Sequence, residues 1–348
     1  MVGVGSALLV SVIAVIFVID PGLISRSGSP TIGSRASSPK ALLAVIDSTT
    51  QVLSIVALDV TPGPVVFAEG SVWFVDETGS QVLRVDHMTR RVVARIAVGQ
   101  DPVDLAVGAG SIWVANHAGR SVSRIDPAAN DVAETIALDF PPVRIGASDR
   151  AVWVAGAGVL GRGDRYPKSD LATIEPATNQ VIDSARFRAA AGCAPFLGAD
   201  AGEDWAASAL GEVWKLDPQG GRPAREAKRS GMAWAGMFVD QADGAIWLGS
   251  DGSPGQIVSL DPSTGLFSRP IRIGTTKDRI GSGCEPIWIT VGGRYLWGTN
   301  ADDDSVSVID RTSRQGVGSL GLGGRPTGLA FGVEHVWVVV DLRSQPHG

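Results

Sequence analysis

Reactive and basic side chains are scarce in this chain of 348 residues. It has two cysteines, four histidines and five lysines, and its formal net charge is −6. This acidic balance argues against nucleic acid as a partner, because a surface that binds the phosphate backbone needs clustered Lys and Arg. The sequence contains neither a Gly-x-Ser-x-Gly nucleophile elbow nor a His-Glu-x-x-His metal motif. It therefore predicts no catalytic constellation, no metal site and no cofactor.

Tryptophan, in contrast, is abundant, with ten Trp against two Tyr. Seven of the ten share one local setting, a short apolar segment after a Gly- or Asp-containing turn, and these seven are Trp73, Trp113, Trp153, Trp205, Trp247, Trp297 and Trp337. The spacing between successive members is nearly regular, with the two longest steps after Trp153 and Trp247. We interpret the seven as packing anchors of a repeated unit.

A second marker gives the same count. Most of these tryptophans are followed, at a similar distance along the chain, by an acid that often has Pro next to it, and these acids are Asp86, Asp126, Glu175, Asp217, Asp261 and Asp310. A seventh acid, Asp47, precedes the first tryptophan. Such an acid opens a turn, because its side chain accepts hydrogen bonds from the backbone N–H groups that follow it, and Pro presets φ at the second position. Each acid therefore predicts a tight hairpin.

Residues 99–138 are the cleanest copy of the unit. We expect strands at 102–107, 111–115, 121–125 and 132–138, where apolar and polar residues alternate between turn signals. A period of about 40 residues built from four short strands is typical of a propeller blade. The sequence thus predicts an all-β, seven-bladed β-propeller over residues 41–341, followed by a short tail at 342–348.

The two ends of this region are incomplete blades. Residues 42–59 supply only third and fourth strands, whereas residues 326–341 supply only a first and a second strand. Together they make one blade, and the ring then closes without an exposed sheet edge. We therefore expect six continuous blades and one blade that is closed by N- and C-terminal strands.

The segment before the propeller differs in character. Residues 2–19 form an uncharged, mostly apolar run whose length is at the lower limit for crossing a bilayer. Residues 21–40 are rich in Ser, Gly and Pro, as in a flexible linker. We expect a single N-terminal transmembrane helix within residues 1–20 that anchors the propeller; a cleaved signal segment, and hence a secreted protein, is the alternative.

Several repeats resemble a known class of propeller. Val98-Gly99-Gln100-Asp101-Pro102 and Gly110-Ser111-Ile112-Trp113-Val114-Ala115-Asn116 are similar to YVTN-type repeats of extracytoplasmic β-propellers. More narrowly, they resemble propellers joined through one transmembrane helix to bacterial, notably actinobacterial, Ser/Thr kinases and regulators. The resemblance implies a membrane-tethered sensor or interaction module outside the cytoplasm, and we expect the propeller to be monomeric. Its expected partner is a small molecule, a cell-wall fragment or a protein.

Virginiamycin B lyase is a more distant resemblance with the same seven-bladed plan. That family's chemistry implies a histidine in a loop that leads into a blade and a carboxylate just after the tryptophan-bearing strand. In this chain the residues three positions after the blade tryptophans are Asp76, Asn116, Gly156, Ser208, Ser250, Asn300 and Val340, and no loop entering a blade contains His. A channel-mouth enzyme therefore remains only the alternative to a binding module.

A ligand is expected at the channel mouth, where the loops between blades and those between second and third strands emerge together. The residues that we assign to this rim are Trp234, Asp101, Phe140, Glu285, Arg325, Asn116, His117 and Asn300. Trp234 stands where other blades have Pro, so it either stacks on a ligand or fills the gap that the missing Pro leaves. Cys193 and Cys284 hold equivalent positions in two blades and either form a disulfide or remain two partly buried thiols.

Overall fold

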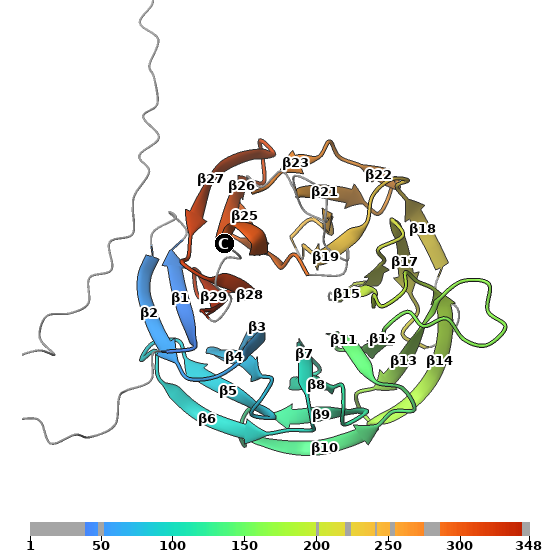
Figure 1. Cartoon of the computed structure of the whole chain (residues 1–348), viewed down its shortest axis with the longest axis horizontal. Helices are drawn as coiled ribbons and strands as arrows, with labels where there is room; N and C mark the ends of the chain where they lie inside the picture. Colours follow the sequence, from blue (N-terminus) through green and yellow to red (C-terminus); the bar gives the residue numbers. More distant parts are fainter. Residues whose placement is uncertain are drawn as a thin grey trace, which may run out of the picture. The chain divides into compact units, whose positions relative to one another are not determined.

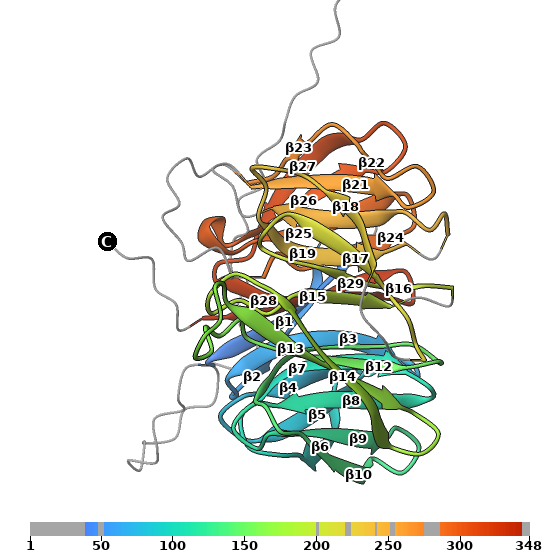
Figure 2. The same cartoon turned by 90° about the vertical axis from the view of Figure 1, so that its right-hand side faces the viewer.

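The computed structural model describes residues 39–47, 52–199, 202–219, 224–240, 242–250, 255–274 and 286–342. These residues form seven β-sheets arranged around a central axis (Figure 1). In Figure 2 the axis of the ring lies horizontally, and most of the labelled strands run along it. The prediction of an all-β, seven-bladed propeller is confirmed.

The split blade joins the two ends of the ring, as the sequence predicts. Its strands are β1 (Ala41–Asp47), β2 (Val52–Leu58), β28 (Arg325–Gly332) and β29 (His335–Asp341), in the order β2-β1-β29-β28. Strand β1 pairs with β29 antiparallel over seven residue pairs. Figure 1 shows the blue N-terminal strands beside the red C-terminal strands. The ring is closed by backbone hydrogen bonds between segments from the two ends of the propeller sequence.

Six continuous blades complete the ring, each as an antiparallel meander. The first three consist of β3 (Pro62–Ala68), β4 (Ser71–Asp76), β5 (Gln81–Asp86) and β6 (Val92–Ala97), then β7 (Pro102–Gly108), β8 (Ser111–Asn116), β9 (Ser121–Asp126) and β10 (Asp131–Ala137), then β11 (Pro142–Ala147), β12 (Val152–Gly156), β13 (Lys168–Glu175) and β14 (Gln180–Arg188). The innermost strand comes first in each blade, so the first strands line the axis (Figure 1).

The last three continuous blades are less regular. They consist of β15 (Phe196–Ala199), β16 (Asp204–Ala207), β17 (Glu212–Leu216) and β18 (Ala224–Lys228), then β19 (Trp234–Val239), β20 (Ile246–Ser250), β21 (Gln256–Asp261), β22 (Leu266–Phe267) and β23 (Ile271–Arg272), then β24 (Ile289–Gly292), β25 (Tyr295–Asn300), the 3-10 turn η2 (Ala301–Asp303), β26 (Ser305–Asp310) and β27 (Gln315–Gly321). The outer strand of the β19 blade is divided into β22 and β23, because Pro270 between them has no N–H for the ladder.

The seven tryptophans pack the interfaces between blades. Each is at most 2% exposed. Each belongs to a different one of the seven apolar clusters that join neighbouring blades, from Trp337 between the split blade and the β3 blade to Trp297 between the β24 blade and the split blade. Burial of a large aromatic ring contributes several kcal/mol per interface, of the order of 3 kcal/mol or more. The interpretation of these residues as packing anchors is confirmed.

Two interfaces carry an additional arginine clamp. Arg84 lies 4.8 Å over the Trp73 ring, donates from Nε to Ser71 Oγ at 2.9 Å, and reaches the Pro127 carbonyl of the next blade at 2.7 Å. The next interface repeats these contacts with Arg124, Trp113, Ser111 and Pro176. The clamp combines a cation–π contact with hydrogen bonds across the interface. It ties the outer hairpin of one blade to the tryptophan of its neighbour.

The acids at the outer hairpins have the predicted role. Asp126 Oδ1 accepts a hydrogen bond from the Ala128 N–H at 2.8 Å, and Asp310 Oδ1 accepts one from Ser313 N–H at 2.8 Å. These hydrogen bonds favour the ionised form, and the N–H of Ser313 is the largest cause of the lowered pKa of Asp310. The turn after Asp47 lies outside the described residues.

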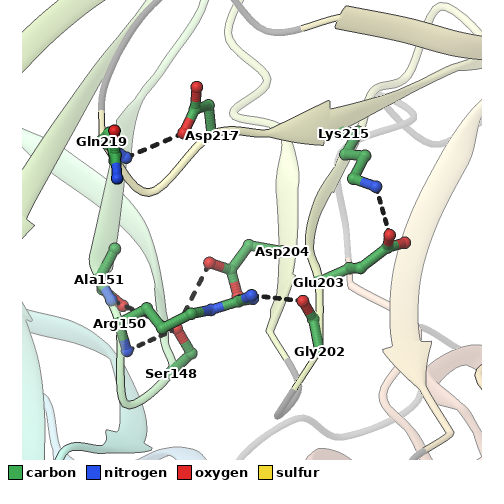
Figure 3. Close-up of polar contacts among 9 residues, drawn as sticks. All are labelled: Ser148, Arg150, Ala151, Gly202, Glu203, Asp204, Lys215, Asp217 and Gln219. Atoms are coloured by element: carbon green, nitrogen blue, oxygen red, sulfur yellow. Dashed lines mark hydrogen bonds and ion pairs between the residues drawn. The ribbon is translucent and has the colours of Figure 1, made fainter.

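One blade interface is polar where the others are aliphatic. Asp204, at the position before Trp205, is fully buried, whereas the equivalent residue is Val, Ile or Leu in the other six blades. As Figure 3 shows, Arg150 reaches from the β11–β12 hairpin toward Asp204 and the Gly202 carbonyl, and Ser148 Oγ lies 3.3 Å from Asp204 Oδ2. Burial raises the pKa of Asp204 and its polar neighbours oppose that shift. This network holds the β11 and β15 blades together on the face where the first hairpins lie.

The predictions for the N-terminal segment concern residues that the structure does not describe. Residues 1–20, the linker up to residue 38 and the tail from residue 343 lie outside the described residues. Within the described part of the chain, no helix has the length and apolar character needed to cross a membrane. The transmembrane anchor therefore stays a prediction.

Candidate functional site

The central channel is apolar along most of its wall. A cavity of about 320 Å³ runs between the first strands of all seven blades and is lined by residues such as Phe67, Leu105, Ile145, Phe238 and Phe331. Among the described residues that line it, Asp104 and Arg144 are the charged ones. A charge that is placed in an apolar channel is costly unless it has a partner. These two charged residues therefore mark the part of the channel that is the best candidate for a functional site.

A second cavity of about 430 Å³ forms the mouth. Its wall is largely apolar, with Pro62, Pro64, Val103, Val143 and Pro326, and its charged lining residues among those described are Glu77, Arg144, Arg325 and Asp341. The two cavities share three lining residues, which are Arg144, Pro286 and Trp288. Arg144 therefore stands where the mouth passes into the channel.

One level of the first strands forms this passage. In each blade the blade tryptophan pairs with a residue of the first strand, as Trp113 does with Ala106 and Trp153 does with Gly146. The residues two positions before these partners are Pro64, Asp104, Arg144, Phe196, Gly236, Trp288 and Gly328. We call this set the neck ring. All of its members except Gly328 line one or both cavities.

The guanidinium of Arg144 is held by aromatic rings. Its Cζ lies 5.1 Å from the centre of the Phe196 ring and 5.9 Å from that of Trp288. Its Nε is buried without a hydrogen-bond partner, and its Nη1 makes one long contact of 3.4 Å with the Val143 carbonyl. No salt bridge joins it to a carboxylate of the described residues. Desolvation lowers the pKa of Arg144, against the effect of the nearby Asp104, but an arginine keeps its charge in proteins. The neck ring thus contains a positioned cation with unused donors.

Asp104 is the opposite charge at this level, but its oxygens are used elsewhere. It is 5% exposed, and it accepts hydrogen bonds from the N–H groups of Leu105 at 3.0 Å and Ile145 at 3.1 Å. Desolvation raises the pKa of Asp104 to about 6, although Arg144 and the two N–H groups act in the opposite direction. Because its folded-state pKa lies above the unfolded value, ionisation of Asp104 reduces stability as pH rises from about 4 to about 6. The carboxyl group therefore titrates in mildly acidic solution.

A glycine allows two segments of the neck ring to approach closely. A Cβ on Gly236 would collide with the carbonyl oxygen of Ile287. Any side chain at this position would displace the backbone that leads into Trp288. The close approach of β19 to residues 286–288 therefore requires Gly236.

Asn116 and Asn300 brace the loops that follow their strands. Asn116 is fully buried, and its Nδ2 donates to Ser121 Oγ at 3.2 Å and Ser123 Oγ at 3.0 Å. Asn300 makes the same pair of hydrogen bonds with Ser305 and Ser307, at 3.0 and 2.9 Å. Each amide thus ties the end of a second strand to the third strand. The ligand role predicted for Asn116 and Asn300 stays a prediction beside this loop-bracing role.

Asp101 and His117 belong to two loops that are joined by a hydrogen bond. Asp101 is exposed with φ of +53°, and its carbonyl accepts the His117 N–H at 2.8 Å. The half-buried His117 ring donates from Nδ1 to the Pro142 carbonyl at 2.9 Å. That hydrogen bond joins the β8–β9 loop to the next blade, close to Arg144. Both residues remain predicted contacts on the rim.

The two predicted aromatic contacts are buried. Phe140 is 7% exposed and packs in the cluster between the β7 and β11 blades. Trp234 is fully buried and stacks on Phe267, with ring centres 5.6 Å apart. The packing alternative describes the position of Trp234, because its ring offers no surface to a ligand here. The aromatic rings that do reach the cavities include Phe196 and Trp288 of the neck ring.

Of the two remaining predicted contacts, Arg325 and Glu285, only the first lies within the described residues. Arg325 is half-buried and lines the mouth cavity. Burial raises the pKa of Asp304, and the nearby Arg325 guanidinium opposes that shift. Glu285 lies outside the described residues. Arg325 is thus the predicted rim residue whose position agrees best with contact to a ligand.

Only one residue of the predicted cysteine pair, Cys193, lies within the described residues. Cys193 is 5% exposed in the turn that leads into β15, where its carbonyl accepts the Gly158 N–H at 2.8 Å. Cys284 lies outside the described residues. The disulfide stays a prediction, which a thiol assay on denatured, unreduced protein tests.

Sequence reasoning missed the neck ring although a signal for it exists. The rim residues Asp101, Phe140 and Arg325 precede the neck-ring members Asp104, Arg144 and Gly328 by three or four positions. Six members lie nine residues before a blade tryptophan, and Gly236 lies eleven before Trp247. A comparison of the residues nine positions before the blade tryptophans would have grouped Asp104, Arg144, Phe196 and Trp288.

Comparisons with known proteins agree on the fold alone. No protein-family profile matches the sequence, and no curated protein matches it. Among solved structures, the chain is similar to hydrazine synthase from Kuenenia stuttgartiensis (15% identity, TM-score 0.59, 78% of this chain and 89% of that chain). It is also similar to apo AztD from Citrobacter koseri (12%, 0.59, 86% and 97%) and to the WD40 β-propeller domain of Doa1 (11%, 0.59, 80% and 92%). Proteins as different as these share this architecture, so function must be argued from the site.

Proposed function

We propose that this chain is a non-catalytic binding module that holds a small molecule, a cell-wall fragment or a segment of a partner protein in the mouth cavity. The supporting observation is the mouth cavity of about 430 Å³, which opens through the neck ring into the channel. Its wall combines apolar side chains with a few charged groups, as ligand sites commonly do. Because the closed ring fixes the first strands, the site exists before a ligand arrives.

A bulky side chain in the mouth tests this proposal. Thr327 is half-buried, lines the mouth cavity and is not part of the neck ring, so Thr327→Trp is expected to fill the cavity without changing the channel. The matched control is Thr264→Trp, at an exposed outer hairpin. In a native mass-spectrometry screen of small molecules and cell-wall fragments, ligands bound by the unmodified protein should be lost from the first variant and kept by the second. Ligands that persist on Thr327→Trp would place binding elsewhere.

The same proposal puts the propeller outside the cytoplasm, as the sensor or interaction part of a membrane-anchored protein. Support comes from the sequence, in the uncharged residues 2–19, the Ser-, Gly- and Pro-rich residues 21–40 and the YVTN-type repeats. A C-terminal alkaline phosphatase fusion of the full chain in a bacterial host should be active and remain in the membrane fraction, because that enzyme needs the oxidising exterior. Fluorescence from a cytoplasm-specific reporter at the same position, with an inactive phosphatase fusion, would contradict the assignment.

A channel-mouth enzyme related to virginiamycin B lyase is the second candidate. Asp76 is a carboxylate at the position after a tryptophan-bearing strand that the resemblance implies. It accepts hydrogen bonds from the side chain of Gln81 at 2.8 Å and the N–H of Thr61 at 3.1 Å, so it braces its loop as Asn116 does. Metal retained through purification, or turnover of a cyclic depsipeptide, would favour the enzyme over the binding module.

A further inference from the structure

The position of Arg144 in an otherwise apolar passage requires an explanation. Its charge has no salt bridge among the described residues, and its Nε is buried without a partner. Leaving a buried donor unsatisfied costs about 1–3 kcal/mol, and more when the group is charged. The cation would be better satisfied when a group that is absent from the chain itself occupies the neck ring.

Asp104 does not supply that group. Its two carboxylate oxygens accept the N–H groups of Leu105 and Ile145, and they lie beyond salt-bridge distance of the guanidinium. Asp104 therefore acts on Arg144 through space, while the hydrogen-bond donors of Arg144 remain available. A planar anion that accepts two parallel hydrogen bonds matches a guanidinium best.

The aromatic neighbours prepare Arg144 for such a ligand. Phe196 and Trp288 contact it at 5.1 and 5.9 Å, so the side chain is already ordered before binding. Trp288 is itself fixed, since its backbone N–H donates to Thr299 Oγ1 at 2.9 Å and its carbonyl accepts the Thr299 N–H at 3.0 Å. An anion at this point therefore meets a preorganised cation.

The mouth provides room for the rest of the ligand. Above Arg144, the wall contains Pro62, Pro64, Val103, Val143 and Pro326. This surface suits an apolar or aromatic body rather than a sugar or a polyphosphate. The ligand would enter with its charged end leading and keep its body in the mouth cavity.

We propose that the neck ring binds an organic carboxylate, with the carboxylate on Arg144 and an apolar body in the mouth cavity. This inference rests on the proposed binding function and names its ligand class. Asp104 sets the strength of the interaction, because its negative charge opposes the anion. Other charged groups that line the site are Glu77, Arg325 and Asp341 at the mouth.

Calorimetric titration with matched probes tests the inference. Naphthalene-2-carboxylate should bind the full-length protein at least about 10-fold more tightly than the neutral naphthalene-2-carboxamide, since a charge-assisted hydrogen bond is worth about 1.5–3 kcal/mol. Arg144→Gln should reduce the affinity for the carboxylate by about 10-fold or more and leave the carboxamide nearly unchanged. Arg95→Gln, at an exposed position of β6, is the matched control and should behave as the unmodified protein.

The affinity for the carboxylate probe should also depend on pH. A purely structural role of Arg144 would not produce this dependence. As pH falls from about 7.5 to about 5.5, protonation of Asp104 removes a negative charge while the probe stays ionised, so affinity for the carboxylate should rise several-fold. Asp104→Asn should bind as tightly at the higher pH as at the lower.

Each contrary outcome has a distinct meaning. Equal binding of carboxylate and carboxamide, both blocked by Thr327→Trp, overturns the carboxylate site and leaves the binding module standing. Absence of binding by either probe also overturns the carboxylate site, and the binding module is then judged by the ligand screen alone. Probe binding that survives Thr327→Trp overturns both. Circular dichroism and the melting temperature of Arg144→Gln show whether any loss reflects unfolding.

Discussion

Replacement of Trp113 by alanine is expected to lower the free energy of unfolding by about 3–5 kcal/mol, a large fraction of the stability of a typical domain. Trp113 is fully buried between the β7 and β11 blades, and its Nε1 donates to the Gly108 carbonyl at 2.9 Å. Arg124 lies 5.1 Å over the ring, so the arginine clamp of this interface is lost as well. Urea unfolding followed by circular dichroism measures the effect.

Trp288→Ala is the matched comparison. Trp288 is half-buried and lines both cavities, so its removal enlarges a space that already exists and should cost about 1–2 kcal/mol. It should weaken binding of the naphthoate probe instead. Equal losses of stability from the two substitutions would contradict the division between blade anchors and the neck ring.

Removal of residues 1–60 is expected to abolish the soluble, monomeric propeller. Strand β1 pairs with β29 over seven residue pairs, and its side chains enter two apolar clusters, Leu43 and Val45 on one side and Leu42 and Ile46 on the other. Without β1 and β2, the edge of β29 and both clusters would be exposed, and an open edge of this kind pairs with other chains. The effect should exceed that of any single substitution.

A chain that begins at Pro39 is the control. It retains β1, β2 and all seven sheets of the compact unit Pro39–Gly348. Size-exclusion chromatography should show a monomer for this chain and aggregates for the chain that begins at residue 61. A monomer with unchanged melting temperature from the shorter chain would show that ring closure is unnecessary.

Closure and the neck ring are linked by the same backbone. Because the ring cannot open, the first strands keep fixed positions, and Arg144 of β11 is held near Phe196 of β15 and Trp288, which precedes β24. A site that is assembled from several blades needs such a frame, since a small displacement of one donor loses most of its hydrogen bond. Substitutions that loosen blade packing should therefore weaken probe binding even when they lie far from the mouth.

The blade pattern was predictable because it depends on local chemistry. Each blade tryptophan needs a neighbouring blade to cover it, and hairpin acids such as Asp126 and Asp310 accept hydrogen bonds from N–H groups within three residues of themselves. The rim residues depend on more than local chemistry. The sequence left Trp234 open between a ligand contact and a packing role, because the direction of a side chain at the end of a strand depends on bulges and on the next blade. In β7 and β11 the pairing register shifts directly after the proline, which moves the following residues toward the channel.

By itself, the sequence determined the number of blades, their strand order and the closure of the ring, because repeated tryptophans and turn acids act within one blade or between neighbours. Only the tertiary structure decided that Asp104, Arg144, Phe196 and Trp288 meet at one level of the channel. These residues belong to four different blades and lie far apart in the chain. Their shared offset from the blade tryptophans groups them in the sequence, but their encounter around one axis results from the curvature of the ring.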